Sequence, residues 1–385
     1  MKKWIGLLAL LAAFPPLSTD MYLPAIPSLA QQWRQPLWVI NLTLVCFFMT
    51  YSFFMLVYGP VSDRFGRRPL LKTGISIYIL ASLMCALAPN AAALIVFRII
   101  QAAGGACASS LALAISRDVF EVREREKVLA YIGVIVALCP MLSPVIGGWL
   151  LAFFSWRWIF VLLAVLGAIA LLWVYRMPET LLPVDRTTRV GLFANYFRLI
   201  CNPSYLGLVF LVSFSAVPLF AFIGASSDIY ITRFGQSAQV YGYFFGFNAM
   251  ALMAGALACV RLSRLVSTRS ILTAGFAGIA IGGVWLLLNA RQSPWDLALP
   301  MFLISFSTGM SRPPSNNLVL QQAKQGVGSA SSLLMFFIMT FGASAMWLIS
   351  LDWPDKIQIL GLMALIGGGV ASACWLVLKK AARSQ

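Results

Sequence analysis

Long apolar runs alternate with short polar turns along almost the whole chain of 385 residues. A helix needs about 20 mostly apolar residues to cross the hydrocarbon core of a bilayer. Twelve runs approach or exceed that length, and the longer ones imply tilt or extension beyond the lipid. They cover roughly residues 4–30, 37–60, 70–88, 91–116, 128–153, 157–176, 204–231, 239–260, 270–289, 295–311, 326–350 and 357–378. The pattern predicts an all-α polytopic membrane protein with twelve transmembrane helices.

Composition supports the same class, since 61% of the residues are hydrophobic and only 10% are charged. A soluble domain has about a quarter of its residues charged, so a soluble fold is excluded. The chain has no histidine, which excludes histidine metal sites and histidine proton relays. Its seven cysteines show no metal or redox spacing and are interpreted as small apolar fillers. We expect no metal or cofactor, and any protonation switch must use a carboxylate.

The net charge of +16 raises the possibility of nucleic-acid binding. If both termini are cytoplasmic, however, the inner segments hold 22 basic residues and the outer segments hold 5. This asymmetry is the positive-inside rule, so the basic residues set topology and contact anionic lipid headgroups of the bilayer. Lys2 and Lys3 before an apolar run also fit a signal peptide, but the run continues to Leu29, which favours a first membrane span.

The longest polar stretch between spans separates two sets of six. We therefore expect an N-terminal bundle at 1–177, a cytoplasmic linker at 178–203 and a C-terminal bundle at 204–385. Apolar residues at helical spacing in the linker predict an amphipathic helix in the cytoplasmic interface; they are Leu192, Phe193, Tyr196, Phe197 and Ile200. The halves also look like repeats, because Ser18–Leu23 (Ser-Thr-Asp-Met-Tyr-Leu) resembles Ser226–Ile231 (Ser-Ser-Asp-Ile-Tyr-Ile). Parallel six-helix repeats place substrate between the halves.

One charged turn, Gly59–Leu71 (GPVSDRFGRRPLL), lies between the second and third spans. Gly59 allows close approach, Gly66 can adopt positive φ, and Pro69 suits the first position of the third span. Asp63 can accept bonds from helix-start amides or pair with arginines. The arginines are Arg64, Arg67 and Arg68, and Asp118, Glu121 and Glu124 offer them acids. Such a network can latch one conformation.

Two charged residues inside spans are the leading candidates for chemistry. A carboxylate within the membrane is costly and usually faces the protein interior, so Asp20 is a functional candidate. Pro24 lacks the N–H that would bond to the Asp20 carbonyl, so the helix should bend there. Arg98 shares a small, polar helix face with Gln101 and Gly105. We expect ionised Asp20 to pair with Arg98 and protonation to weaken the pair; a structural ion pair is the alternative.

Asp228 occupies the place of Asp20 in the second half. It can serve as a second proton site or as a site for cationic compounds. It can equally lie in water at the outer end of the seventh span.

The fifth span carries a stripe of glycine and proline at alternating steps of four and three. The stripe comprises Gly133, Pro140, Pro144, Gly147 and Gly148, together with Ala137. Small residues let helices approach closely and prolines bend them. Beyond ordinary packing, a close, bent contact across the halves can seal one side of a cavity.

These motifs together resemble the twelve-span drug:proton antiporters of the major facilitator superfamily, and most closely their bicyclomycin/chloramphenicol-resistance branch. The resemblance rests on Leu17–Pro27, the Gly59–Leu71 turn, Arg98–Gly105 and Gly133–Gly148, with Gly326–Ser331 in the second half. It implies that Asp20 is the proton-coupling acid, Arg98 its partner, the turn a gating latch and the fifth span the antiporter motif. Some related exporters carry a further acid two turns earlier on the first span. This chain has Ala12 there, which argues against a two-acid site and against strongly cationic substrates.

The resemblance implies proton-driven export of small amphipathic compounds, including chloramphenicol-like drugs, by alternating access across a bacterial inner membrane. We expect a monomer with both termini cytoplasmic and with the proton gradient as its energy source. The expected pocket residues are Tyr22, Asn41, Tyr51, Gln101, Met141, Phe220, Asn248 and Asn316. A major facilitator exporter or importer of a metabolite or metallophore is the alternative. A membrane enzyme is remote, because a catalytic cluster such as HExxH is missing.

Overall fold

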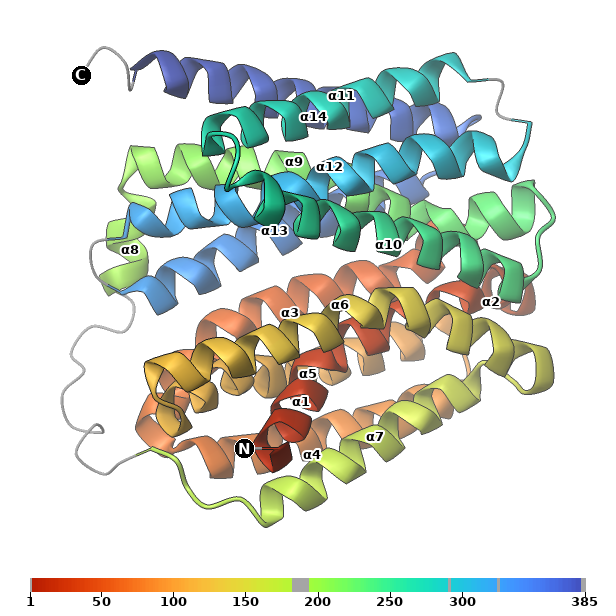
Figure 1. Cartoon of the computed structure of the whole chain (residues 1–385). Coiled ribbons are helices and arrows are strands. Elements are labelled where there is room, and N and C mark those ends of the chain that lie inside the picture. Colours follow the sequence, from red (N-terminus) through yellow and green to blue (C-terminus); the bar gives the residue numbers. More distant parts are fainter. Residues whose placement is uncertain (1, 182–193, 290–291, 324–325, 382–385) are drawn as a thin grey trace. The chain divides into compact units, whose positions relative to one another are not determined.

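The fold is a set of long helices, shown by a computed structural model that describes residues 2–181, 194–289, 292–323 and 326–381 (Figure 1). Contacts divide the chain into two units. The first comprises Met1–Phe193 with Ala238–Gly242, and the second comprises Ala194–Ser237 with Tyr243–Gln385. Predictions for residues 182–193, including the start of the amphipathic helix, lie outside the described residues.

The first unit begins with a broken helix and continues with five unbroken ones. Its elements are α1 (Lys2–Asp20), the short 3₁₀ helix η1 (Leu23–Ala25), α2 (Ile26–Trp33), α3 (Leu37–Phe65), α4 (Arg67–Ala86), α5 (Ala91–Val119), α6 (Val122–Phe153) and α7 (Arg157–Tyr175). Helix α5 packs against α3, α4 and α1, so Arg98 lies at the centre of the unit.

The second unit repeats this design. It contains α8 (Ala194–Ile200), α9 (Pro203–Ser227), the π-helical turn η3 (Asp228–Arg233), most of α10 (Ala238–Leu262), α11 (Thr268–Leu288), α12 (Pro294–Gln321), α13 (Val327–Ser350) and α14 (Lys356–Ala381). The pairs α4–α7, α4–α5 and α1–α6 of the first unit correspond to α11–α14, α11–α12 and α9–α13 of the second. Sequence and packing therefore repeat together.

Eleven helices among the described residues are long and apolar enough to cross a membrane. The twelfth expected run lies in α12, which has 28 residues and suffices in length. Its apolar content is lower because it also contains Asp296, Arg312 and several prolines, serines and asparagines. The predicted all-α polytopic fold is confirmed.

Glycine permits the tightest helix contacts in both units. A Cβ on Gly104 of α5 would lie 2.6 Å from the Gly74 carbonyl oxygen of α4. In the second unit, a Cβ on Gly283 of α11 would lie 2.5 Å from the Leu365 nitrogen of α14. Distances this short leave no room for a methyl group, so these glycines set how closely the helices pack.

Candidate functional site

Asp20 lies where the first membrane span is interrupted. Helix α1 contains Pro15 and Pro16, ends at Asp20 and continues through η1, which holds Pro24, into α2. The bend predicted from Pro24 is therefore present. The Asp20 residue is only 5% exposed. The break thus holds a carboxylate inside the first unit.

The carboxylate has one hydrogen-bond donor among the described residues, the side chain of Thr19. Its hydroxyl lies 2.9 Å from Asp20 Oδ1, 3.0 Å from the Pro15 carbonyl oxygen and 3.4 Å from the Pro16 carbonyl oxygen. A hydroxyl has a single proton to donate, so these three acceptors compete for it. Thr19 was not a candidate residue in the sequence, since threonine on an apolar helix gives no distinguishing signal.

Arg98 of α5 is fully buried and binds backbone and amide oxygens. Its Nη1 donates to the Ser18 carbonyl oxygen at 3.0 Å and to Gln101 Oε1 at 2.7 Å. The guanidinium carbon lies 4.2 Å from the Phe47 ring centre and 5.3 Å from that of Tyr22. Aromatic faces attract a desolvated cation, so the rings stabilise the buried charge.

The structure does not bring Asp20 and Arg98 into an ion pair, although the sequence predicts one. Arg98 contacts α1 two residues earlier, through the Ser18 carbonyl. Its Nε and Nη2 are buried and have no hydrogen-bond partner among the described residues. The coupling role of the pair stays a prediction, with two arginine donors unused in this conformation.

A buried polar cluster surrounds Arg98 and joins three helices. Gln101 Nε2 donates to Ser82 Oγ at 2.8 Å, and the hydroxyls of Ser18 and Tyr78 lie 2.7 Å apart. Ser82 also donates to the Tyr78 carbonyl oxygen. Both the amide oxygen and the amide nitrogen of Gln101 are bonded, so Gln101 connects α4 and α5 in this conformation, and its pocket role stays a prediction.

The charged turn centres on Arg67. Its side chain binds Asp63 at 2.7 Å, Asp118 at 3.0 Å and the hydroxyl of Ser62. Gly66 has φ of 97°, the positive value that the turn was expected to need. Of the acids proposed as partners, Asp118 reaches Arg67, whereas Glu121 and Glu124 are exposed.

Two details of the turn differ from expectation. A Cβ on Gly59 would meet nothing within 4 Å, so the close approach predicted there is absent. Helix α4 starts at Arg67, which places Pro69 in the third helical position and not the first. Proline is still tolerated there, because the first amides of a helix lack intrahelical acceptors.

Glu179 is the residue of this turn that sequence reasoning missed. After α7 ends, its carboxylate accepts hydrogen bonds from the amides of Arg67 at 2.9 Å, Arg68 at 3.2 Å, Thr180 at 3.0 Å and Leu181 at 3.1 Å. Partial burial raises the pKa of Glu179, but these four amides outweigh it and hold the pKa below its usual value. The helix-start amides expected to bind Asp63 are thus satisfied by an acid 112 residues from Arg67.

The remaining arginines of the turn lie at its rim. Arg68 Nη2 donates to the Tyr175 carbonyl oxygen at 2.6 Å, which ties α4 to the end of α7. Arg64 is exposed and lies over the ring of Phe65. The gating role of the turn stays a prediction, because one conformation shows the contacts but not the movement.

The proline and glycine stripe follows α6. Pro140 and Pro144 lie inside the helix. Gly147 packs on the carbonyl of Met21, so closely that a Cβ would overlap it, and Gly148 is buried. Gly133 meets open space. The stripe therefore holds α6 against the break beside Asp20, and its sealing function stays a prediction.

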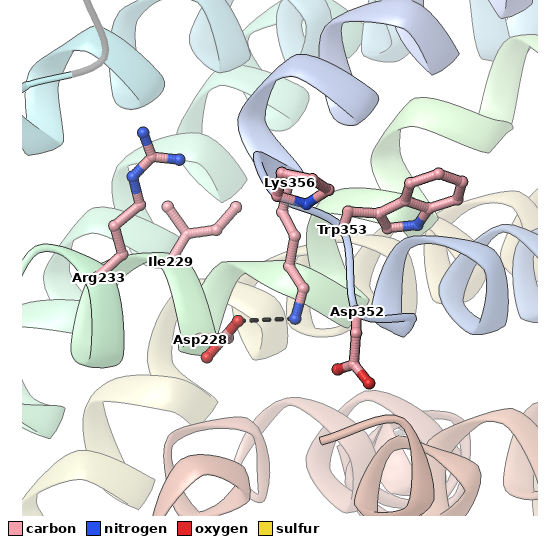
Figure 2. Close-up of a pocket in the computed structure, with 7 residues that line it drawn as sticks. Asp228, Ile229, Arg233, Asp352, Trp353 and Lys356 are labelled. Atoms are coloured by element: carbon pink, nitrogen blue, oxygen red, sulfur yellow. Dashed lines mark hydrogen bonds and ion pairs between the residues drawn. The ribbon is translucent and has the colours of Figure 1, made fainter. Parts of the chain in front are cut away.

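Asp228 has surroundings unlike those of Asp20. It is the first residue of the π-helical turn η3, and its carboxylate forms an ion pair with Lys356 Nζ at 2.8 Å (Figure 2). Lys356 begins α14, 128 residues further along the chain. A cation therefore neutralises this carboxylate in the structure.

The residues expected to line a pocket divide between the units. Tyr22, Asn41, Tyr51, Gln101 and Met141 belong to the first unit, and Phe220, Asn248 and Asn316 to the second. Tyr22 accepts a hydrogen bond from Thr43, and Phe220 packs against Gly342. The oxygens of the Asn248 and Asn316 side chains are buried without a partner among the described residues. The pocket itself stays a prediction.

Two six-helix repeats with a carboxylate at a broken first span define a secondary transporter. The chain belongs to the Major Facilitator Superfamily, whose profile matches residues 8–346. It is a multi-pass membrane transporter of small molecules and not an enzyme. The family resemblance seen in the motifs is confirmed.

Relatives and solved structures agree with that assignment. The chain is 30% identical over 335 residues to the bicyclomycin resistance protein homolog of Haemophilus influenzae, covering 85% of this chain and 83% of the relative. It is 27% identical to multidrug resistance protein D of Escherichia coli, covering 97% and 94%. The xylose transporter XylE from Escherichia coli, in a partially occluded inward-open conformation, has a TM-score of 0.76 at 14% identity, with 98% and 97% covered.

Proposed function

We propose that this transporter exports small amphipathic, chloramphenicol-like compounds in exchange for protons by alternating access. It does so as a monomer in the inner membrane of a bacterium, with both termini cytoplasmic. The observation that carries the proposal is the Asp20 carboxylate, which is buried at a helix break and has no cationic partner among the described residues. Such an acid can gain or lose a proton without breaking an ion pair, so protonation is coupled directly to the conformation of α1.

Thr19 supplies a physical link between the proton and the helix. When Asp20 is ionised, the Thr19 hydroxyl donates to the carboxylate. When Asp20 is protonated, the acid needs no donor and the hydroxyl can donate to the Pro15 carbonyl instead. Because Pro15 and Pro16 already interrupt the hydrogen bonding of α1, one exchanged bond there changes the bending of the helix.

Arg98 has two roles in this proposal. In the present conformation its Nη1 donates a hydrogen bond to the Ser18 carbonyl oxygen, which holds the end of α1, two residues before Asp20, against α5. Its unpartnered Nε and Nη2 supply the donors that ionised Asp20 would meet in another conformation. The cost of burying these donors favours such a partner, since an unsatisfied group attached to a charge is expensive in a dry interior.

The names of two relatives support the direction of transport and the class of cargo proposed here. Two of them are named for bicyclomycin resistance and multidrug resistance. Resistance by a membrane transporter requires export, so the same direction is proposed here. Amphipathic cargo suits a chain whose expected pocket residues are mainly aromatic and amide side chains.

The proposal is tested by proton movement in inverted membrane vesicles with an imposed gradient. Adding chloramphenicol or a related amphipathic compound should release protons from vesicles with the wild-type protein. Vesicles with Asp20→Asn should show no compound-dependent release. If no compound acts on wild type, the cargo is a metabolite or metallophore. If the response survives Asp20→Asn, the coupling proposal is wrong.

A further inference from the structure

Helix α1 is weakened by its own prolines before it reaches Asp20. Pro15 has no N–H, so the carbonyl of Leu11 loses its donor within the helix. The hydroxyl of Ser109 on α5 lies 3.2 Å from that carbonyl oxygen and takes the place of the missing amide. The last turns of α1 therefore depend on side chains of neighbouring helices for their position.

Tyr78 of α4 contacts these last turns in two ways. Its ring stacks on the ring of Phe14, with 4.6 Å between the ring centres and 6° between the ring planes. Its hydroxyl lies 2.7 Å from the Ser18 hydroxyl, which in turn lies 2.6 Å from the Phe14 carbonyl oxygen. A carbonyl only accepts, and each hydroxyl has one proton to donate. All three groups are therefore satisfied when Ser18 donates to Phe14 and Tyr78 donates to Ser18.

The side chain of Tyr78 has little room to move, because it is fully buried among three helices. A Cβ on Gly105 of α5 would lie 3.5 Å from one edge of the ring, and a Cβ on Gly167 of α7 would lie 3.2 Å from the other. The backbone of Tyr78 is held as well, since its carbonyl accepts from Ser82, which accepts from Gln101. The phenol hydroxyl thus has a fixed position beside α1.

Ser18 is held by two helices at once. Arg98 of α5 donates to its carbonyl oxygen at 3.0 Å, and Tyr78 of α4 donates to its hydroxyl. Ser18 lies two positions before Asp20, in the segment that follows the prolines of α1. A change in the bending of α1 therefore pulls on α4 through Tyr78 as well as on α5 through Arg98.

We propose that Tyr78 is a positioning residue for the coupling of proton exchange to helix movement. This role rests on the proposed function, in which protonation of Asp20 changes the bending of α1. The Tyr78 hydroxyl passes that change to α4 by holding Ser18. Without the hydroxyl, the end of α1 can move alone, and the protonation of Asp20 has less effect on the surrounding helices.

The transport test compares Tyr78→Phe with wild type in inverted vesicles, with chloramphenicol as the compound. The substitution keeps the stacked ring and removes only the hydroxyl. The maximal rate of compound-dependent proton release should fall by about fivefold, the effect of one neutral hydrogen bond. The half-saturating concentration of chloramphenicol should stay unchanged, because the buried side chain acts on the conformational step and not on binding. An unchanged maximal rate, or a change in half-saturation alone, would overturn the proposal.

Tyr205→Phe is the matched control in the second unit. Tyr205 is also fully buried, and its hydroxyl donates to the Ala330 carbonyl oxygen at 2.7 Å. Each variant loses one buried phenol donor, so both should show a similar small loss in thermal unfolding. Only Tyr78→Phe should slow proton release. If Tyr205→Phe slows it as much, the effect is one of general stability and the positioning role is wrong.

A double-mutant cycle tests whether Tyr78 acts through Ser18. Ser18→Ala removes the acceptor of the phenol hydrogen bond. The variant with both substitutions should release protons no more slowly than the slower single variant, because the two changes break the same bond. If the two losses multiply instead, Tyr78 acts through another contact and the proposal fails.

Hydrogen exchange separates this role from the proton-exchange proposal, because it needs no transport. In the purified full-length protein in nanodiscs, the amides of Leu17–Asp20 should exchange faster in Tyr78→Phe than in wild type or Tyr205→Phe. If chloramphenicol releases no protons from wild-type vesicles but this exchange is faster, the proton-exchange proposal fails while Tyr78 still holds α1. If exchange in this segment is unchanged, the role of Tyr78 is wrong whatever the vesicles show.

Discussion

The two related segments Ser18–Leu23 and Ser226–Ile231 place an aspartate at corresponding positions in very different surroundings. Both acids mark the end of a regular α-helix, α1 or α9. Asp20 is buried with a hydroxyl as its only donor among the described residues, whereas Asp228 binds the ammonium of Lys356. The repeated sequence therefore preserves the helix interruption but not the electrostatics. Asp20 has a hydroxyl donor, whereas Asp228 has a cationic partner.

The largest expected difference follows from removing each charge. Asp20→Asn should abolish compound-dependent proton release in inverted vesicles, because no titratable group remains at the break. Asp228→Asn should still show release, because Lys356 already neutralises that carboxylate. If both variants lost proton release to the same extent, the two acids would act as one coupled site, and the difference proposed between Asp20 and Asp228 would be wrong.

The next effect concerns the hydroxyl that only Asp20 uses. Thr19→Val keeps the shape but removes the donor to the carboxylate, and hydrogen bonds to charged groups contribute about 1.5–3 kcal/mol. The rate of compound-dependent proton exchange at a fixed pH should therefore fall by about tenfold or more, because 1.36 kcal/mol corresponds to a factor of ten. Thr19→Ser retains the hydroxyl and should keep the wild-type rate. An unchanged rate in Thr19→Val would refute the link.

A smaller effect compares the starts of α4 and α11, which also correspond in the repeat. Helix α11 is capped locally by Ser267, which accepts from the Ser270 amide, whereas α4 depends on the distant Glu179. Glu179→Ala should lower the free energy of unfolding by about 1 kcal/mol, the usual cost of a lost cap. Thermal unfolding of the purified protein measures this. Glu124→Ala, at an exposed acid on α6, is the control and should have little effect.

Acidification provides a related check on Glu179. Because its folded-state pKa is lowered, its stabilising contribution is complete above the ordinary glutamate pKa of about 4.3 and is lost as pH falls through the folded value. The stability difference between wild type and Glu179→Ala should therefore shrink below about pH 4. A difference that stays constant down to the lowest pH would show that the carboxylate charge is unimportant.

The smallest effect is expected at the ion pair between Arg233 and Asp355, where the arginine side chain is 39% exposed. Arg233→Gln should change stability by less than about 1 kcal/mol, as is usual for exposed pairs. By contrast, Arg67→Gln leaves Asp63 and Asp118 without their buried partner and should cost about 3 kcal/mol or more. The two substitutions remove the same charge, so a similar loss in both would contradict the role assigned to burial.

Local features of the fold and site could be predicted because neighbouring residues determine them. The helix interruption after Asp20 follows from Pro24, and the positive φ of Gly66 follows from the glycine between two helices. The all-α class follows from the apolar runs alone. In each case the deciding atoms lie within a few residues of the feature.

Partners that lie far apart in the chain could not be predicted. Glu179 reaches the start of α4, and Lys356 reaches Asp228, across more than a hundred residues each. Arg98 was expected to form an ion pair with Asp20. In the structure it donates hydrogen bonds to the Ser18 carbonyl oxygen and to the Gln101 side-chain oxygen instead. An acid near many arginines has several possible partners in sequence, and only the packing of the helices selects one.

The ring-enclosed guanidinium of Arg98 is a buried positive charge that forms no ion pair with a carboxylate among the described residues in this conformation. Such a charge repels a second cation and attracts electron-rich groups, and the low-dielectric surroundings extend its range. If Asp20 couples transport to protons as proposed, this buried charge would disfavour a cationic cargo beside it and favour a neutral one.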